Sequence, residues 1–464
     1  MFMVIKLLKN IKEENVMSNE FKVGFARIKA TPPMGIPLWG YYITRLADGI
    51  LDDLEVNAVM LCKGQVKVLL MTVDHCGLFK DVVDKMKERI VLATGIDKNA
   101  IFIHSTHTHN APEVSLTSTN PLVAKYTLTL IDKVTVAAET ALKDLKPAKA
   151  GFGVGNAPKV AFIRRFRMKD GSVKTNPGVN NPDILEPIGE VDERVNVLRI
   201  DRENASTLVL ANFGNHPDTV GGTKVSRDWP GFARTFTEKA IDNVNCLLFN
   251  GAQGDVNHVN VHPTGGDMNG MFLDFDGCSR GYEHTKHIGM VVAGAVMQVF
   301  SKAEYFDVDF IKFEQKLVDI PSNKPTPDEM PLAREYNRLH LEGKDDQIPY
   351  TAMMLTTVVA DAARKVRLEN APEFFPLLFS AVRIGEVAFF GIPGEPFTNV
   401  GKGIKQTEGY KLVFPCVNTN AKEGYFPMQD AYDEGGYEAR SSNFKAGVAE
   451  IIIKEAQNIL KELL

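Results

Sequence analysis

The chain has 464 residues and a net charge of −5 at neutral pH, with 53 Lys and Arg against 58 Asp and Glu. Hydrophobic residues make up 44% and charged residues 24%, which is typical of a folded globular protein and excludes a mainly disordered chain. We expect no nucleic-acid partner, because the chain has no excess of basic residues to meet phosphates. No stretch approaches the ~20 apolar residues of a membrane span, so we expect no stable membrane association either.

The first 20 residues are expected to form a flexible N-terminal extension. A secretory signal needs roughly 7–15 apolar residues in a row, but Lys6 interrupts the N-terminal apolar run after five residues. A cytoplasmic location is therefore expected. The patterned sequence begins only near Phe21, and Met17 is an alternative start of the chain.

Short apolar runs alternate with longer helical patterns after this extension, which predicts an α/β fold. Two hairpins are expected, at residues 56–62 with 66–73 and at residues 377–384 with 387–392. Further strands are expected at residues 101–105, 195–200, 207–213 and 246–249, and helices at 79–94, 121–145, 282–300 and 444–464.

Two stretches break the alternation of strands and helices. Residues 164–187 are rich in Asn, Pro, Gly and Arg and predict a long functional loop, and four prolines between 320 and 331 predict a surface excursion. Because the short strands on both sides need one another to bury their faces, residues 21–464 are expected to form one large domain. It would hold a central mixed β-sheet flanked by helices, with the active site on loops at strand ends.

The densest chemical signal is the run HSTHTHNAP, residues 104–112, which follows the predicted strand 101–105. In an extended chain His107 and His109 point to the same side, because side chains alternate with a period of two. Both could bind one metal ion, or one could bind the metal and the other the substrate. His104 points to the opposite face and is interpreted as structural. A histidine-rich surface loop is the alternative, which three of ten histidines within six residues disfavour.

Three other polar motifs follow apolar strands and contain His216, the Gly254-Asp255 turn with Asn257 and His258, and Glu395 between two prolines. A further motif holds Tyr425, with Tyr437 twelve residues later. A lone histidine at a strand end is usually structural, and a Gly-rich stretch can be a simple tight turn. No motif is specific by itself. The five cysteines form no CxxC pair, which argues against a cysteine-based zinc site.

Together, and in this order, the motifs resemble those of the N-terminal catalytic domain of the zinc-dependent neutral and alkaline ceramidase family. The resemblance begins at Val23-Gly24-Phe25-Ala26 and ends with Tyr425 and Tyr437, so it covers most of residues 21–445. It implies one zinc ion held by His107, His216, Glu395 and Tyr425. It also implies Tyr437 as a second active-site tyrosine, His109 beside the metal or facing the substrate, and Arg164 lining the site, with Arg165 and Arg167 as alternatives to Arg164.

The chain departs from this family in two respects. Asn257 stands where the ceramidases carry a serine, and an amide side chain cannot be acylated. The sequence also ends at Leu464, directly after the predicted closing helix, whereas ceramidases continue into a β-rich domain and are usually secreted or membrane-associated. Both differences weaken the expectation of a lipid substrate more than the expectation of zinc hydrolysis.

His, His and Glu hold zinc in several zinc peptidases and leave a position for water, whose pKa the metal lowers toward ~7. The sequence therefore predicts a zinc-dependent hydrolase that cleaves a linear amide of a small molecule by attack of zinc-bound water. We expect Tyr437 and Asn257 to steady the oxyanion, His109 or Asp255 to carry the proton, and Arg164 and His258 to contact the substrate. Alternatives are a zinc enzyme acting on a sugar-derived substrate or an ester, and a zinc-holding binding or regulatory protein with degenerate catalysis. The oligomeric state is left open.

Overall fold

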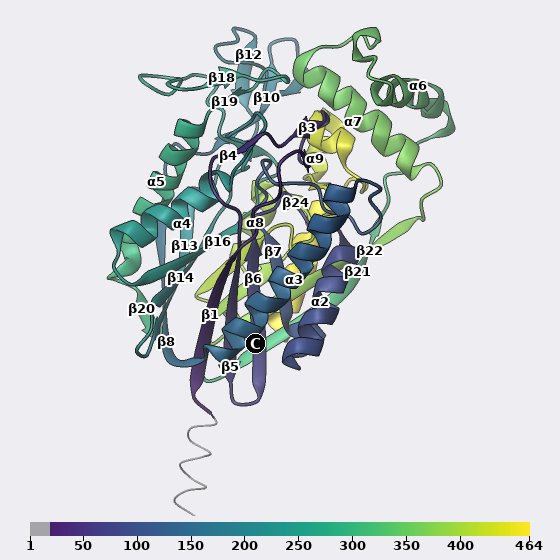
Figure 1. The fold of residues 1–464 in the computed structure, drawn as a ribbon. Helices are drawn as coiled ribbons and strands as arrows, with labels where there is room; N and C mark the ends of the chain where they lie inside the picture. Colours follow the sequence, from purple (N-terminus) through teal and green to yellow (C-terminus); the bar gives the residue numbers. More distant parts are fainter. Residues whose placement is uncertain (1–18) are drawn as a thin grey trace, which may run out of the picture.

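The computed structural model describes residues 19–464, so all but the last two residues of the predicted extension lie outside it. Its centre is a nine-stranded mixed β-sheet in the order β16-β14-β13-β8-β1-β5-β6-β7, with β20 paired to β8 (Figure 1). The strands are β1 (Phe21–Lys29), β5 (Glu55–Lys63), β6 (Val66–Val73), β7 (Ile101–Ser105), β8 (Lys146–Asn156), β13 (Arg194–Arg202), β14 (Thr207–Phe213), β16 (Val244–Asn250) and β20 (Glu304–Phe306). β6 runs parallel to β7, and β14 runs parallel to β16.

A second, four-stranded sheet packs on one face of the first. It consists of β21 (Ile311–Pro321), β22 (Phe374–Ile384), β23 (Val387–Gly391) and β25 (Leu412–Cys416) in that order. The two sheets share one apolar core in which Phe102 and Phe249 of the larger sheet meet Phe389 of the smaller one. Aromatic side chains bury large apolar areas, so this core joins the sheets face to face.

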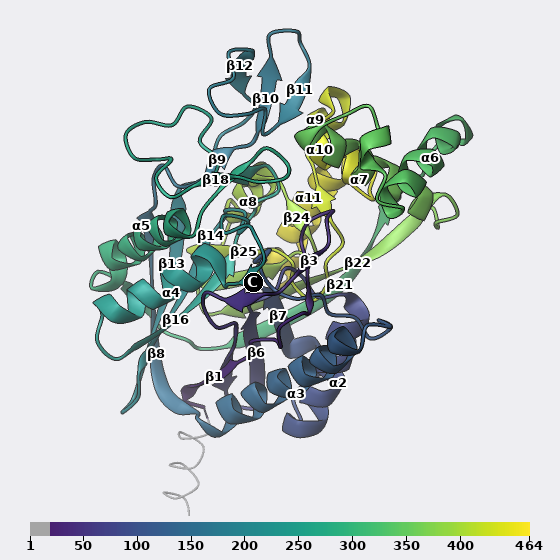
Figure 2. The same ribbon diagram turned by 45° about the horizontal axis from the view of Figure 1, so that its top comes forward.

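Helices cover the outer faces of both sheets. α2 (Lys80–Thr94) and α3 (Pro121–Lys143) lie over the half of the larger sheet that contains β1 and β5, and α4 (Asp228–Ala240) and α5 (Tyr282–Phe300) lie over the half with β13, β14 and β16 (Figure 2). α8 (Thr398–Lys405) and α11 (Val448–Glu462) cover the smaller sheet. The main body thus has four layers, in the order helices, larger sheet, smaller sheet, helices.

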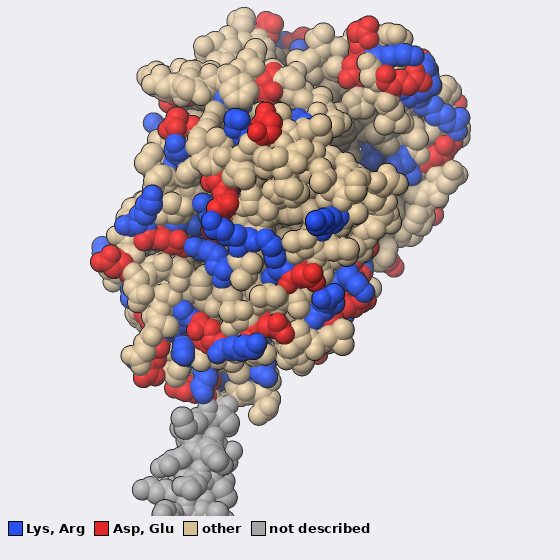
Figure 3. Space-filling model, viewed as in Figure 1, with Lys and Arg blue, Asp and Glu red and all other residues tan. Residues whose placement is uncertain are grey.

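A further helix pair, α6 (Met330–Leu341) and α7 (Ala352–Leu368), stands outside these layers. Figure 3 shows a hollow in the surface beside this pair, with basic side chains inside it. The short helix α10 (Tyr437–Ser441) packs against α7, and the short helix α9 (Gln429–Glu434) packs against α10 and α11. None of the helices in residues 19–464 is long and apolar enough to cross a membrane.

The predicted α/β fold with a central mixed sheet is confirmed. The hairpins β5–β6 and β22–β23 and the helices α2, α3, α5 and α11 agree with their predicted ranges to within a few residues. The predicted flanking by helices holds for the outer faces, whereas the inner face of the central sheet packs on the second sheet, which the sequence did not predict as a separate layer.

Several elements were missed for identifiable reasons. β8 carries three glycines, which are poor strand formers, but they allow close packing: a Cβ on Gly155 would lie 2.1 Å from the carbonyl oxygen of Ala295 in α5. Residues 164–187, predicted as a loop, contain the small sheet of β10 (Arg165–Met168), β11 (Val173–Thr175) and β12 (Ile184–Pro187). Residues 320–331, predicted as an excursion, contain the end of β21 and the start of α6.

Candidate metal centre

Three buried side chains from distant parts of the chain meet at one edge of the sheets. His107 follows β7, His216 follows β14, and Glu395 begins the short strand β24 (Glu395–Pro396). The two Nε2 atoms are 3.3 Å apart, and Glu395 Oε2 lies 3.2 Å from His107 Nε2 and 3.9 Å from His216 Nε2. These three residues form a group that could hold a metal ion.

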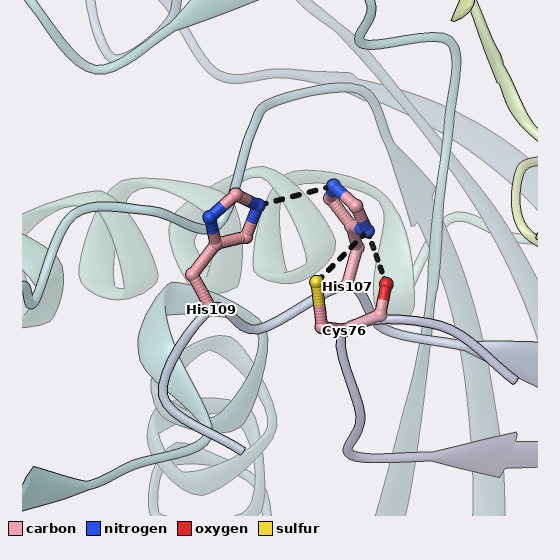
Figure 4. Close-up of side chains that lie close together, drawn as sticks. All are labelled: Cys76, His107 and His109. Atoms are coloured by element: carbon pink, nitrogen blue, oxygen red, sulfur yellow. Dashed lines mark hydrogen bonds between the residues drawn. The ribbon is translucent and has the colours of Figure 1, made fainter. Parts of the chain in front are cut away.

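The backbone at His107 departs from the predicted extended conformation. Its φ is 74°, in the left-handed region that non-glycine residues seldom adopt, and such strain is concentrated at functional sites. The expectation of an extended chain through the motif is therefore wrong at this residue. The rings of His107 and His109 nevertheless meet, with their Nε2 atoms 3.2 Å apart (Figure 4), and His109 Nε2 is also 3.1 Å from His216 Nε2.

The hydrogen bonds around this group fit a metal ion. His107 Nδ1 donates to the carbonyl oxygen of Cys76, and His216 Nδ1 faces the carbonyl oxygen of Gln253 at 3.5 Å. When Nδ1 of a neutral imidazole carries the proton, Nε2 carries only a lone pair. The lone pairs of His107 Nε2 and His216 Nε2 and a carboxylate oxygen of Glu395 thus face one another in a buried place. Burying hydrogen-bond acceptors that have no donor costs free energy. Ligand atoms at about 2.0–2.1 Å from a tetrahedral zinc ion are about 3.3 Å apart, close to the separations seen here.

Without a metal ion, a proton on His107 can balance the carboxylate. Burial opposes charge on His107, but Glu395 outweighs burial and raises the pKa of His107 to about 10. Burial favours a neutral Glu395, but His107 outweighs it and holds the pKa of Glu395 far below its usual range. Burial, with Arg164 and His107, lowers the pKa of His216 to about 3. A metal ion must therefore displace one proton here.

Two tyrosines lie beside this group. Tyr425 begins β26 (Tyr425–Phe426), which pairs with β24 so that Tyr425 is the direct neighbour of Glu395. The rings of Tyr425 and Tyr437 are 5.5 Å apart between centroids. Burial raises the pKa of both phenols well above its usual value, so both stay protonated in the metal-free protein. Tyr425 thus lies near the group, and its role as fourth ligand stays a prediction.

The Arg164 guanidinium lies over the ring of one of these tyrosines. Its guanidinium carbon lies 5.4 Å from the centroid of the Tyr425 ring, Nε lies 2.7 Å from Glu438 Oε1, and Nη2 donates to the carbonyl oxygen of Gly254 at 2.7 Å. The alternatives Arg165 and Arg167 both pair with Glu434 instead. Arg164 therefore contacts Tyr425, and its role in lining the site stays a prediction.

Three other predicted residues are engaged away from the metal group. Asp255 Oδ1 accepts hydrogen bonds from the backbone N and the Oγ1 of Thr398 at the start of α8, both at 2.7 Å. Asn257 Nδ2 donates to Asn176 Oδ1 at 3.1 Å. His258 Nδ1 lies 3.1 Å from Asp218 Oδ1, and its Nε2 lies 2.7 Å from the carbonyl oxygen of Ser279. The structure does not bring these three side chains to the metal group, and the roles assigned to them stay predictions.

The metal group opens into a cavity of about 1070 Å³, slightly larger than the usual small-molecule site of about 300–1,000 Å³. Its wall is rich in aromatic residues and includes Trp39, Tyr41, Tyr42, Phe79, Phe375, Tyr425, Tyr437 and Phe444. His107, His109, Glu395, Arg367 and Lys422 add polar groups. A large cavity with a few convergent polar groups is a default site for a small molecule.

Cys76 and Lys422 also lie beside the metal group, and the sequence motifs did not point to either residue. Cys76 Sγ lies 4.0 Å from His107 Nδ1 (Figure 4), and Cys76, His107 and His109 form a second, overlapping group of potential metal ligands. Lys422 Nζ lies 3.5 Å from Cys76 Sγ. The position of Cys76 in the sequence could have indicated that it lies near His107. Cys76 follows β6 and His107 follows β7, and segments that follow adjacent parallel strands emerge at the same edge of the sheet.

Two solved structures share this fold. Neutral ceramidase from Pseudomonas aeruginosa has 16% sequence identity and a TM-score of 0.71, over 96% of this chain and 75% of that one. A ceramidase complexed with C2 has 16% identity and a TM-score of 0.70, over 96% and 76% of the two chains. No family model and no curated protein matches the sequence. The resemblance predicted from the motifs is therefore confirmed for the fold: this chain has the neutral ceramidase fold and a buried His and Glu group that could hold a metal ion.

Proposed function

We propose that this protein is a zinc-dependent hydrolase that cleaves a linear amide bond in a small molecule. The observation that carries the proposal is the buried group of His107, His216 and Glu395, whose facing acceptors call for a cation at the edge of a large cavity. Zinc suits nitrogen and oxygen ligands of this kind. Tyr425, as the strand neighbour of Glu395, is the proposed fourth ligand.

When bound, zinc polarises a substrate carbonyl and lowers the pKa of water. The protein side chains would supply the proton transfers. Burial keeps the pKa of His109 well below its usual value, so its ring is neutral and Nε2 can accept the proton of an attacking water. That proton would pass to the amine nitrogen as the carbon–nitrogen bond breaks, which yields a carboxylic acid and an amine.

Tyr437 is the proposed donor to the oxygen that gains negative charge. Its phenol is protonated because burial raises its pKa, and its ring lies against that of Tyr425 in the cavity wall. Hydrogen-bond donors aimed at a developing oxyanion act strongly in a site that excludes water. Arg164 is proposed to orient Tyr425, since its guanidinium lies over that ring.

An amide is favoured because two solved structures that share this fold are described as ceramidases. A small polar substrate is favoured over membrane ceramide because Lys422 and Arg367 line the cavity with their charges. A zinc-holding protein without catalysis is the second candidate. Asn257, where ceramidases carry a serine, is the observation that favours it.

A substrate panel tests the proposal. Zinc-loaded protein would be offered short soluble N-acyl amides, matching esters, N-acylated amino sugars and ceramide in micelles, with and without a chelator. We expect chelator-sensitive hydrolysis of soluble amides and poor turnover of ceramide, with no activity in Glu395→Ala. Hydrolysis that survives both chelation and Glu395→Ala would contradict the proposed metal chemistry. Zinc binding without turnover of any substrate would favour the second candidate.

A further inference from the structure

Lys422 is a cation in the cavity wall that forms no close ion pair with a carboxylate of the described residues. Its Nζ lies 4.1 Å from the centroid of the Trp39 ring and 3.5 Å from Cys76 Sγ. No Asp or Glu oxygen within residues 19–464 lies within 4.0 Å of it. Lys80, in the same wall, differs in this respect, since Asp84 Oδ2 lies 2.5 Å from its Nζ.

A half-buried ammonium without a close carboxylate partner is costly unless something compensates for its lost hydration, and here Cys76 Sγ accepts one of its hydrogen bonds. The face of Trp39 compensates in part, because the negative face of an aromatic ring attracts a cation. The ammonium still has donors to spare, since Lys carries three and accepts none. The geometry leaves these donors for a molecule in the cavity.

The charge of the surrounding wall favours an anion there. Arg367 also lines the cavity and donates to Asn443 Oδ1 at 2.6 Å, again without a carboxylate within 4.0 Å among the described residues. Of the acidic residues in the wall, Glu395 belongs to the metal group and Asp81 accepts from the backbone N of Val82. The third, Glu423, has no oxygen within 4.0 Å of Lys422 or Arg367 among the described residues.

Lys422 is also close to the metal group. Cys76 Sγ lies 3.5 Å from Lys422 Nζ and 4.0 Å from His107 Nδ1, so one sulfur atom separates the ammonium from a proposed ligand. Lys422, His107 and Glu395 line the same cavity, so one small molecule in it can contact both Lys422 and the metal group. We propose that Lys422 binds an anionic group of the substrate, so that the enzyme acts on acidic amides such as N-acylated amino acids.

This inference rests on the proposed amide hydrolysis, and the experiment separates the two. Zinc-loaded wild type, Lys422→Gln and Lys422→Arg would be assayed with an N-acetyl amino acid, its uncharged carboxamide and an N-acetylaminoalkyl phosphate. Lys85→Gln is the matched control, because Lys85 is an exposed lysine that pairs with Glu88. The carboxamide keeps the scissile bond and removes only the charge.

We expect the wild type to prefer the charged substrates, and the preferred anion identifies the group as carboxylate or phosphate. Loss of a charge-assisted hydrogen bond should raise KM for the preferred substrate about 10- to 100-fold in Lys422→Gln, with little change for the carboxamide or in kcat. Lys422→Arg should keep most of the preference, and Lys85→Gln all of it. Equal wild-type rates for acid and carboxamide, or equal damage to both in Lys422→Gln, would show that Lys422 does not bind the substrate.

If no amide is cleaved, the proposed function is wrong, and calorimetric titration still decides the role of Lys422. Binding of the N-acetyl amino acid to zinc-loaded wild type that is lost in Lys422→Gln and kept in Lys422→Arg would support an anion site. Equal binding in all three proteins, or no binding in any, would refute it.

Discussion

Glu395 and Tyr425 are direct neighbours on two parallel strands of two residues each, β24 and β26. The backbone N of Glu395 donates to the carbonyl oxygen of Gly424 at 2.8 Å, which fixes the register. Paired residues on adjacent strands lie about 5 Å apart and point to the same face. Two predicted ligands that are distant in the sequence are thus held side by side by backbone hydrogen bonds, before any metal binds.

The first prediction concerns metal content. Protein purified without added metal should contain about one equivalent of zinc, and His107→Ala or His216→Ala should lose most of it, because a tetrahedral site that loses one ligand binds poorly. Tyr425→Phe tests the fourth ligand and should weaken binding less than either histidine variant. Elemental analysis measures the content, with exposed His262→Ala as the control. Full zinc in both ligand variants would refute the assignment.

The second prediction concerns Tyr437. Tyr437→Phe removes the proposed donor to the oxyanion, and loss of such a donor typically lowers kcat roughly 10²- to 10³-fold. Steady-state kinetics on a soluble amide measures this loss, while zinc content should stay normal. Tyr432→Phe is the matched control, because it removes another partly buried hydroxyl, one that donates to the carbonyl oxygen of Phe444 and is absent from the cavity wall. Equal effects of the two substitutions would mean that the Tyr437 hydroxyl acts only on folding.

The third prediction concerns the position of the ceramidase serine. Asn257→Ala should keep measurable activity, because the side chain is engaged with Asn176 and with the backbone N of Val259. Loss of these bonds should cost about 1 kcal/mol of unfolding free energy. Rapid-quench mass spectrometry should find no acylated side chain during turnover. A stoichiometric burst of acyl-enzyme would show that another residue has replaced the serine as nucleophile.

The fourth prediction concerns the buried ion pair between Arg164 and Glu438. Glu438→Gln leaves the guanidinium without its partner, and breaking a buried pair in this way usually costs about 3–5 kcal/mol. Urea unfolding should show this loss, whereas Arg338→Gln, which breaks exposed pairs with Glu335 and Glu342, should cost far less because water screens exposed charges. Similar small losses in both variants would mean that water reaches Arg164.

The fifth prediction concerns pH and the structural His104. Its Nδ1 donates to the carbonyl oxygen of Val417 at 2.7 Å, Nε2 accepts from the backbone N of Asn250 at 2.9 Å, and burial lowers its pKa to about 3. Between pH 6.5 and about 3, only the unfolded chain binds a proton at this residue. Stability should therefore fall by about 1.4 kcal/mol per pH unit as the pH drops through this window.

His104→Gln should be less stable than wild type at pH 7 and should lack this part of the pH dependence. Urea unfolding between pH 4.5 and 7.5 measures both quantities, and the difference between variant and wild type removes the contribution of other groups. Exposed His262→Gln should keep the wild-type slope. An unchanged slope in His104→Gln would show that His104 is not held neutral in the fold.

The sequence by itself determined the local elements and the residues that end them. Helix α3 has apolar residues at helical spacing, and the side chain of Asn120 caps its start by accepting from the backbone N of Leu122 at 2.9 Å. The hairpin β5–β6 follows from two apolar runs around a turn. The polar motifs after β7 and β14 are visible for the same reason, because apolar periodicity and its end are properties of neighbouring residues.

The tertiary structure decided which of these elements are neighbours. The second sheet, the pairing of Glu395 with Tyr425 and the approach of Cys76 and Lys422 to His107 depend on contacts between residues far apart in the chain. The tertiary structure also decided the partners of Asp255 and His258. Asp255 accepts a hydrogen bond from Thr398, and His258 contacts Asp218, although the sequence motif that contains Asp255 and His258 was predicted to belong to the site. A sequence pattern fixes which residues end a strand, but the direction of each side chain depends on the packing of whole layers against one another.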